Sequence, residues 1–185
     1  MNLSIDIREE ITRRVKPIPD FWRGSKHEHW SRLSNDDKGK LGTWIYAHFL
    51  EHWGYEVHPV NDEGDLLYRK NDTEAWRKSE VKAATATLEQ LISGKVNEQL
   101  WFNQIRPLQG GWDEVVLVGV FPNHIKVWRK DREEFLSTMG QMSSTGGLSH
   151  VGTDELVGVT LKKNTRTNNF DEWDLIHNDQ QGKHL

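Results

Sequence analysis

The stretch Ser79-Glu80-Val81-Lys82-Ala83-Ala84-Thr85 (SEVKAAT) overlaps a run, AWRKSEVKA (75–83), whose composition predicts a β-strand. Side chains alternate between the two faces of a strand, so Glu80 and Lys82 project from the same face. Upstream, DLLYRK (65–70) predicts another strand, and Asn71-Asp72 between the two runs is typical of a hairpin turn. Adjacent strands would bring Asp65 and Glu80 together.

The segments before this hairpin predict helices and one strand. YEVHPV (55–60) has strand character. Before it, a helix begins near Asn35-Asp36, which can cap it, and stops at Gly54. Its expected apolar stripe is Leu41, Trp44, Ile45 and Phe49. Residues 20–35 are expected to be irregular or to hold a short helix. Apolar residues spaced by four predict an amphipathic helix over 3–15, ended by prolines.

The segments after the hairpin alternate in type. Leu88, Leu91, Ile92, Val96 and Leu100 have helical spacing and predict a helix over about 87–105. The almost continuous apolar run 114–121 predicts a strand covered on both faces, and 124–128 pairs with it. A helix over 132–139 and strands over 155–161 and 173–176 follow. The expected fold class is therefore α/β, with a mixed central sheet flanked by helices, in one domain spanning 1–185.

Composition excludes several kinds of site. The chain of 185 residues has no cysteine, so a metal must be held by oxygen or imidazole. No apolar run approaches the ~20 residues that span a bilayer, and the N-terminal segment is too charged for a secretory signal. We expect a soluble, cytoplasmic protein without a membrane partner. The net charge of −4 argues against a protein that simply coats DNA.

Asp65, Glu80 and Lys82 have the chemistry of a hydrolytic metal site. Two carboxylates brought together repel each other, and a divalent cation between them relieves that repulsion. Oxygen ligands of this kind suit Mg²⁺. Lys82 would approach a metal-bound water and position or deprotonate it. The other interpretation is a solvated ion pair on an outward face, which contributes little stability.

The pattern GDLL followed by SEVK resembles the PD-(D/E)xK nuclease superfamily. The resemblance covers about residues 36–130, and it implies the restriction endonuclease-like core order of helix, three strands, helix and strand. Residues 1–35 would form an N-terminal helical arm, and 131–185 would be additions for DNA or dimer contact. Gly64 stands where the family has a proline.

The resemblance implies roles for individual residues. Asp65 and Glu80 would be metal ligands, the backbone carbonyl of Val81 a further ligand, and Lys82 the general base or water-orienting group. The implied cofactor is Mg²⁺, for which Mn²⁺ can substitute. Many members carry a glutamate on the first core helix, for which Glu51 is a weak candidate near the helix end. Gln104 is a similarly weak candidate for a polar residue on the second helix.

The implied activity is that of a type II restriction endonuclease cutting double-stranded DNA as a homodimer, in a prokaryotic or phage restriction-modification setting. The 3–15 helix or the histidine-bearing helix could supply the dimer contact. One alternative is a structure-selective phage or repair nuclease, such as a junction resolvase. Another is a DNA-binding module on the same fold that has lost catalysis.

Other patterns suggest further sites. His48, Glu51 and His52 fit H-x-x-E-H, the inverted zincin pattern, but no third ligand stands out downstream. We instead expect both histidines to be buried and hydrogen-bonded. A loop in the C-terminal region carries side chains suited to phosphates and base edges; a solvated hairpin tip is the alternative. The candidate DNA-binding residues in it are Lys162, Lys163, Asn164, Arg166, Asn168 and Asn169.

Overall fold

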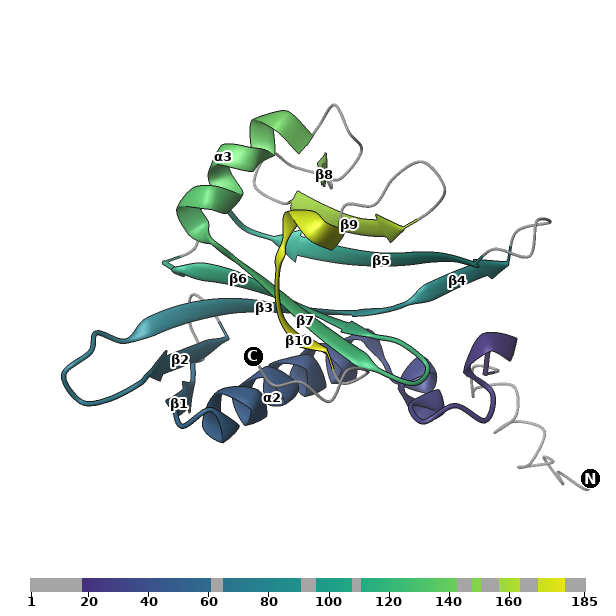
Figure 1. Ribbon diagram of the computed structural model, residues 1–185, viewed down its shortest axis with the longest axis horizontal. Coiled ribbons are helices and arrows are strands. Elements are labelled where there is room, and N and C mark those ends of the chain that lie inside the picture. Colours follow the sequence, from purple (N-terminus) through teal and green to yellow (C-terminus); the bar gives the residue numbers. More distant parts are fainter. Residues whose placement is uncertain are drawn as a thin grey trace, which may run out of the picture.

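A mixed sheet lies at the centre of the protein. The computed structural model describes residues 18–60, 65–90, 96–107, 111–142, 148–150, 157–163 and 170–178. Within them, six strands form one sheet, in which β3 and β6 are parallel and all other neighbours are antiparallel (Figure 1). In spatial order they are β1 (Glu56–Pro59), β2 (Leu66–Arg69), β3 (Arg77–Thr85), β6 (Glu114–Val120), β7 (Ile125–Asp131) and β10 (Asp174–Asn178).

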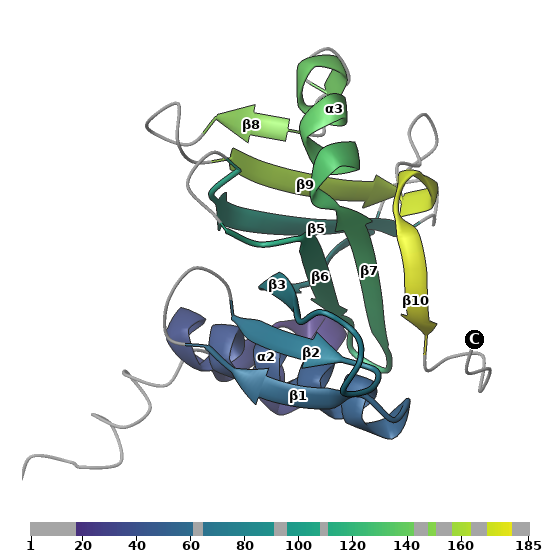
Figure 2. The ribbon, with the colours of Figure 1, turned by 90° about the vertical axis from the view of Figure 1, so that its left-hand side faces the viewer.

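A second, antiparallel sheet packs on one face of the first. Its spatial order is β4 (Thr87–Gln90), β5 (Val96–Ile105), β9 (Val157–Lys163) and β8 (Leu148–His150). Figure 2 shows β5, β8 and β9 running across the direction of β6, β7 and β10. The chain passes from the first sheet into the second at Ala86, between β3 and β4.

The α-helices pack against the central sheet. The helix α2 (Asn35–His52) packs on the face of the six-stranded sheet away from the second sheet (Figure 1). Its N-cap is Ser34, whose hydroxyl accepts a hydrogen bond of 3.1 Å from the amide of Asp37. It stops before Gly54, which has a positive φ of 80°. The helix α3 (Arg132–Met142) follows β7 directly.

Short 3₁₀ helices complete the described structure: η1 (Asp20–Trp22), η2 (Glu28–Arg32) and η3 (Phe170–Glu172). Residues 20–35 thus combine short helical turns with irregular chain, as expected. Among the residues described, no helix is long and apolar enough to cross a membrane.

Two hydrophobic cores lie on the two faces of the central sheet, and β6 contributes to both. Val116, Val118 and Val120 pack on the α2 side, whereas Val115 and Leu117 pack on the side of the second sheet. Every residue of β6 is buried, as its continuous apolar run predicts. The sheet therefore fixes two distinct faces, and each side chain of β3 belongs to one of them.

The helix expected over 87–105 is wrong. This segment forms β4 and β5, and the described part of the chain between β3 and β6 contains no helix. From residue 99 onward the burial alternates: Leu100 and Phe102 are buried, and Trp101 between them is 56% exposed. That period of two belongs to a strand with one covered face. The expected core order therefore fails at its second helix, and a second sheet rather than a helix covers one face of the central sheet. The α/β class with a mixed sheet is confirmed.

The apolar stripe expected on α2 is also wrong in part. The helix buries Gly42, Tyr46 and Leu50, whereas Leu41 and Trp44 are 38% and 62% exposed. The spacing of four along the buried face is ordinary for a helix, but the buried set includes a glycine, which hydropathy does not reveal.

Most other expected elements are present. The strands near 55–60, 65–70, 75–83, 114–121 and 124–128 match β1, β2, β3, β6 and β7, and the helix over 132–139 matches α3. The two late strands match β9 and β10. The helix expected over 3–15 lies outside the described residues.

Candidate functional site

Asp65 lies where β2 begins and holds the neighbouring strand. Its amide donates to the Ser79 carbonyl at 2.8 Å, and its carboxylate Oδ2 accepts from the Val81 amide at 2.7 Å. The antiparallel register places Leu66 opposite Ser79, so Asp65 stands beside Glu80. Residues 70–76 connect β2 to β3, so a longer loop, rather than the tight turn expected at Asn71-Asp72, joins the two strands in this register.

Glu80 and Lys82 project from the same face of β3, as alternation predicts. Glu80 Oε1 and Lys82 Nζ form an ion pair of 2.5 Å, with side-chain exposures of 13% and 23%. Val81 between them points to the opposite face, into the core beneath α2. The face that carries the acid and the amine is the one on which the second sheet packs, where Ala84 belongs to the core. The pair is therefore largely enclosed rather than a freely solvated pair.

The polar backbone groups of Val81 point to the edge of β3 on which β2 lies, just beyond the last β2 residue that pairs with β3. In an extended residue the N–H and C=O point toward the same edge of the strand. Because the Val81 N–H reaches the Asp65 carboxylate, the Val81 carbonyl is directed to this edge as well. The Val81 carbonyl oxygen and the carboxylates of Asp65 and Glu80 thus lie around one end of β2.

Electrostatics link the three side chains. Burial raises the pKa of Asp65 above its ordinary value, and the nearby Glu80 charge raises it further. The Lys82 charge and the hydrogen bond from the Val81 amide act in the opposite direction on that pKa. The site therefore holds two acids and one amine within interaction distance, and ionising the partly buried Asp65 costs free energy.

This set of groups fits a hard divalent cation. Mg²⁺ takes one or two carboxylates and keeps several waters, so Asp65, Glu80 and the Val81 carbonyl suffice as protein ligands. The described residues contain no group of three or more His, Asp or Glu side chains arranged to hold a metal. A zinc site of the zincin kind therefore has no support there, whereas a magnesium site of two carboxylates needs no such group.

A buried carboxylate on the other face of the sheet supports this arrangement. Glu114 of β6 is fully buried and accepts hydrogen bonds from Tyr46, Tyr68 and Ser79 at 2.9, 3.0 and 2.7 Å. Ser79 is also the residue whose carbonyl binds Asp65. Sequence reasoning missed Glu114, because it begins an apolar run and its partners lie far away in the chain. An acidic residue opening an otherwise apolar strand was the available signal.

Gln104 is on a strand rather than on the expected helix. It has a positive φ of 61°, uncommon for a residue other than glycine, at an irregularity in the pairing of β5 with β9. Thr87 of β4 pairs with Gln99, and β5 then continues back over β3, against which it packs. Gln104 itself is exposed near the end of β5.

The other expected residues do not join this site. Glu51 is exposed on α2, which covers the opposite face of the sheet. His48 and His52 were expected to be buried, and this is wrong: both are exposed, and His48 stacks on Trp44 with ring centroids 5.6 Å apart. The side of α2 that carries His48 and His52 faces solvent, because the opposite, buried side consists of Gly42, Tyr46 and Leu50.

The expected DNA-binding residues lie at the limit of the description. Lys162 and Lys163 are the last residues of β9, and Lys162 is opposite Gln99 in the second sheet. Asn164, Arg166, Asn168 and Asn169 lie outside the described residues. Their role stays a prediction.

Comparisons with models of protein families, with curated proteins and with solved structures found no match.

Proposed function

We propose that this protein is a Mg²⁺-dependent endonuclease that hydrolyses phosphodiester bonds in double-stranded DNA, of the type II restriction kind. The observation that carries the proposal is the convergence of Asp65, Glu80 and Lys82 at one end of β2. The Val81 amide binds the Asp65 carboxylate, and Lys82 lies 2.5 Å from Glu80. A merely structural ion pair would not require a second, partly buried carboxylate beside it.

Each residue of the site has its own role in hydrolysis. Asp65, Glu80 and the Val81 carbonyl would hold Mg²⁺, which when bound lowers the pKa of a water ligand and stabilises charge on the phosphate. Lys82, fixed by Glu80, orients the attacking water or takes its proton. The Val81 amide fixes the Asp65 carboxylate, so the ligand geometry is set before DNA arrives.

Cleavage of a supercoiled plasmid with Mg²⁺ tests the assignment. Asp65→Asn and Lys82→Gln are expected to lower the cutting rate by at least about 100-fold, the usual scale for losing a metal ligand or a general base. Matched controls are Glu51→Gln and Lys40→Gln, both exposed on α2. They are expected to cut within about twofold of the unaltered protein. Equal cutting by all four variants would refute the proposed site.

The products distinguish the kinds of nuclease. Discrete, reproducible fragments from a linearised plasmid support sequence-specific restriction. Cutting confined to branched DNA supports the junction-resolving alternative, with the same residues in the same roles. Specific binding without hydrolysis in Mg²⁺ or Mn²⁺ supports the inactive DNA-binding module instead.

A symmetric homodimer would place two such sites on the two DNA strands. The exposed side of α2 suits that contact, since Leu41 and Trp44 are large apolar residues left 38% and 62% exposed. Light scattering after size exclusion is expected to give a dimer, and Trp44→Glu a monomer. A monomer that cuts both strands at the unaltered rate would remove the dimer from the proposal.

A further inference from the structure

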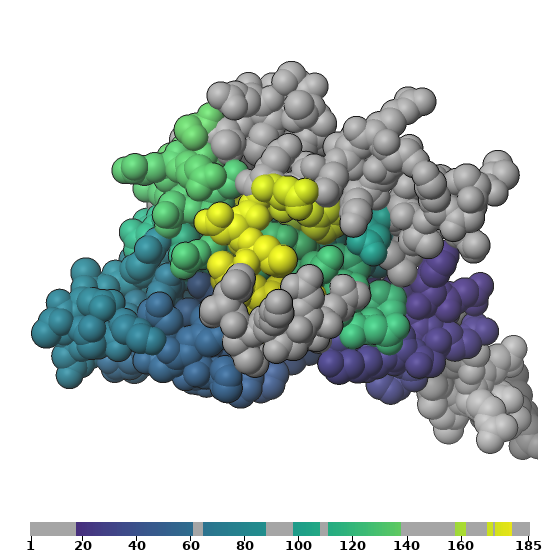
Figure 3. All heavy atoms as spheres, in the orientation of Figure 1, coloured from purple at the N-terminus to yellow at the C-terminus, as the bar shows by residue number. Residues whose placement is uncertain are grey.

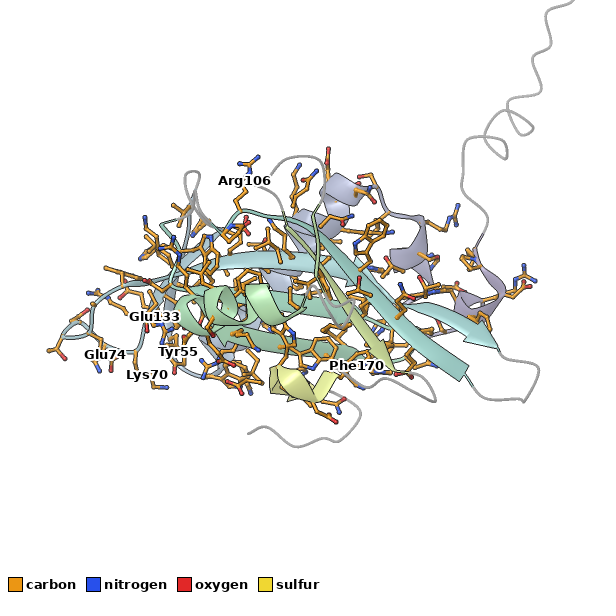
Figure 4. The ribbon with its side chains drawn as sticks, turned by 90° about the horizontal axis from the view of Figure 1, so that it is seen from above. Tyr55, Lys70, Glu74, Arg106, Glu133 and Phe170 are labelled. Carbon is orange, nitrogen blue, oxygen red and sulfur yellow. The ribbon has the colours of Figure 1, made fainter. Side chains whose placement is uncertain are left out.

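A separate cavity lies on the α2 side of the central sheet, away from the face of Glu80 and Lys82. It has a volume of about 500 Å³, within the usual range for small-molecule sites. Residues from α2, from the loops around β1 and β2, and from β7 and β10 line it. Figure 4 shows Tyr55 and Lys70, which belong to this lining, close to each other at one end of the molecule.

Aromatic rings form much of the cavity wall. Tyr68 packs edge-on against Tyr46 and Tyr55, with centroids 6.4 and 5.4 Å apart. Tyr46 and Tyr68 direct their hydroxyls to the buried Glu114. These hydrogen bonds hold both rings, which are only 1% and 4% exposed, so this part of the wall is preorganised. The partly exposed rings of Trp53 and Tyr55 in the same lining supply flat surface that suits a planar ligand.

The polar groups lining the cavity are mainly donors. Arg129 lies opposite Asp174 in the pairing of β7 with β10, but no ion pair of Arg129 is found among the residues that the structure describes. Its charge acts on Tyr46 and Tyr68. The Trp53 indole Nε1 is buried and finds no hydrogen-bond acceptor in the described structure. The Lys70 ammonium donates to the Trp53 carbonyl at 2.5 Å and lies 4.5 Å from the centre of the Tyr55 ring.

No carboxylate lines this cavity in the described part of the chain. Glu114 is behind the tyrosine hydroxyls and fully buried. The cations Arg129 and Lys70 therefore line a space without a protein acceptor of matching charge. An anionic ligand would supply that acceptor.

We propose that this cavity binds a planar aromatic ligand carrying an anionic group, with the ring against Trp53 and Tyr55 and the anion on Arg129. A nucleoside monophosphate and an aromatic carboxylate share this chemistry. The proposal does not rest on the nuclease assignment, since it concerns the opposite face of the sheet and other residues.

Calorimetric titration in metal-free buffer tests it, with deoxynucleoside 5′-monophosphates, the matching nucleosides, indole-3-acetate and inorganic phosphate as probes. At least one ring-bearing anion is expected to bind with a Kd below about 10 mM, and more tightly than its uncharged counterpart or phosphate alone. The ring-bearing anion that binds most tightly shows whether the ligand is a nucleoside monophosphate or an aromatic carboxylate. No binding by any of them overturns the proposal.

Variants locate the binding. Arg129→Gln is expected to weaken binding of the anion about tenfold or more. Trp53→Phe keeps an aromatic side chain but reduces the ring surface that lines the cavity, and is expected to weaken binding several-fold. The matched control is Arg23→Gln, an exposed arginine paired with Asp20. Thermal unfolding checks that each variant folds. If Arg129→Gln does not fold, the binding measured with Trp53→Phe tests the proposal.

The Asp65→Ala background separates the two sites. Binding that persists there and falls with Arg129→Gln or Trp53→Phe supports the cavity. Binding that disappears with Asp65→Ala, or that neither cavity variant weakens, overturns the proposal.

Discussion

At the scale of single residues, the carboxylates of Glu114 and Asp65 have opposite surroundings. Glu114 is fully buried but receives three hydrogen bonds from neutral hydroxyls and has Arg77 at 3.5 Å. Asp65 is partly exposed but has one amide donor and a second carboxylate nearby. The first is satisfied by the fold, whereas the second is left with a cost that a bound cation would remove.

Replacing Asp65 with Asn is expected to stabilise the metal-free protein at neutral pH. The pKa of Asp65 in the folded protein is raised above its ordinary value of 3.8, so just above pH 3.8 the folded state binds more protons than the unfolded chain. The free energy of unfolding therefore falls as pH rises from 3.8 through the folded pKa. Asn does not ionise and avoids this loss. Urea unfolding in a chelating buffer is expected to give the variant a higher midpoint at pH 7. The advantage disappears below about pH 3.8. A variant less stable at pH 7 contradicts the account.

Replacing Glu114 with Gln is expected to destabilise the fold by about 2–4 kcal/mol, because an amide places donors where hydroxyl donors already point. Tyr46→Phe removes one donor and is expected to cost about 1–2 kcal/mol. Urea unfolding measures both. The double variant should cost less than the sum, since Tyr46 and Glu114 share one hydrogen bond. Strict additivity would show that the bond contributes nothing.

At the scale of elements, the closest approach of α2 to the sheet depends on a glycine. A Cβ at Gly42 would collide with the side chain of Ala83 on β3, whereas a Cβ at Gly39 in the same helix meets nothing within 4 Å. Helix propensity disfavours glycine at both positions, so only the packing of α2 on β3 distinguishes them.

Gly42→Ala is therefore expected to lower the free energy of unfolding by about 1–3 kcal/mol, through overpacking. Gly39→Ala is the matched control and is expected to raise it by about 0.5–1 kcal/mol, through helix propensity. Chemical unfolding measures whether each variant lowers or raises the free energy of unfolding. The same sign for both would mean that α2 does not lie as closely on β3 as described.

At the scale of the whole molecule, the central sheet joins two cores and places the candidate site and the aromatic cavity on opposite faces. Glu114 connects these faces through β3, since Ser79 binds it on one side while the Ser79 carbonyl binds Asp65. A ligand that binds only the folded chain stabilises the entire structure by mass action.

Magnesium is expected to raise the thermal unfolding midpoint of the unaltered protein. For a Kd near 1 mM, about 10 mM Mg²⁺ adds about 1.4 kcal/mol, or about 3–5 °C in a chain of this size. Scanning calorimetry at constant ionic strength measures the shift. Glu80→Gln should lose most of it and Glu51→Gln should keep it. A shift of the same size in Glu80→Gln would exclude Glu80 as a ligand.

The sequence by itself determined the elements whose signals are local. Alternation along β3 was enough to put Lys82 on the same face as Glu80, and the strand–turn–strand pattern was enough to make β2 and β3 neighbours. The register that puts Asp65 beside Glu80 comes from the longer 70–76 loop, which a tight turn at Asn71-Asp72 does not predict. The end of α2 before Gly54 and the apolar run of β6 were likewise readable, because each depends on neighbours along the chain. The N-cap was misplaced by one residue, since Ser34 rather than Asn35 or Asp36 caps the helix.

Only the tertiary structure decided the rest. Leu88, Leu91, Ile92, Val96 and Leu100 fit a helix by spacing, yet the segment forms β4 and β5, since a strand lets Leu100 and Phe102 cover the central sheet while β9 pairs with β5. The hydrogen bonds of Glu114 join residues 35 to 68 positions apart. The cavity lining likewise runs from Tyr46 to Ile176. Burial and pairing between distant segments outweigh local propensity, and a linear pattern does not contain them.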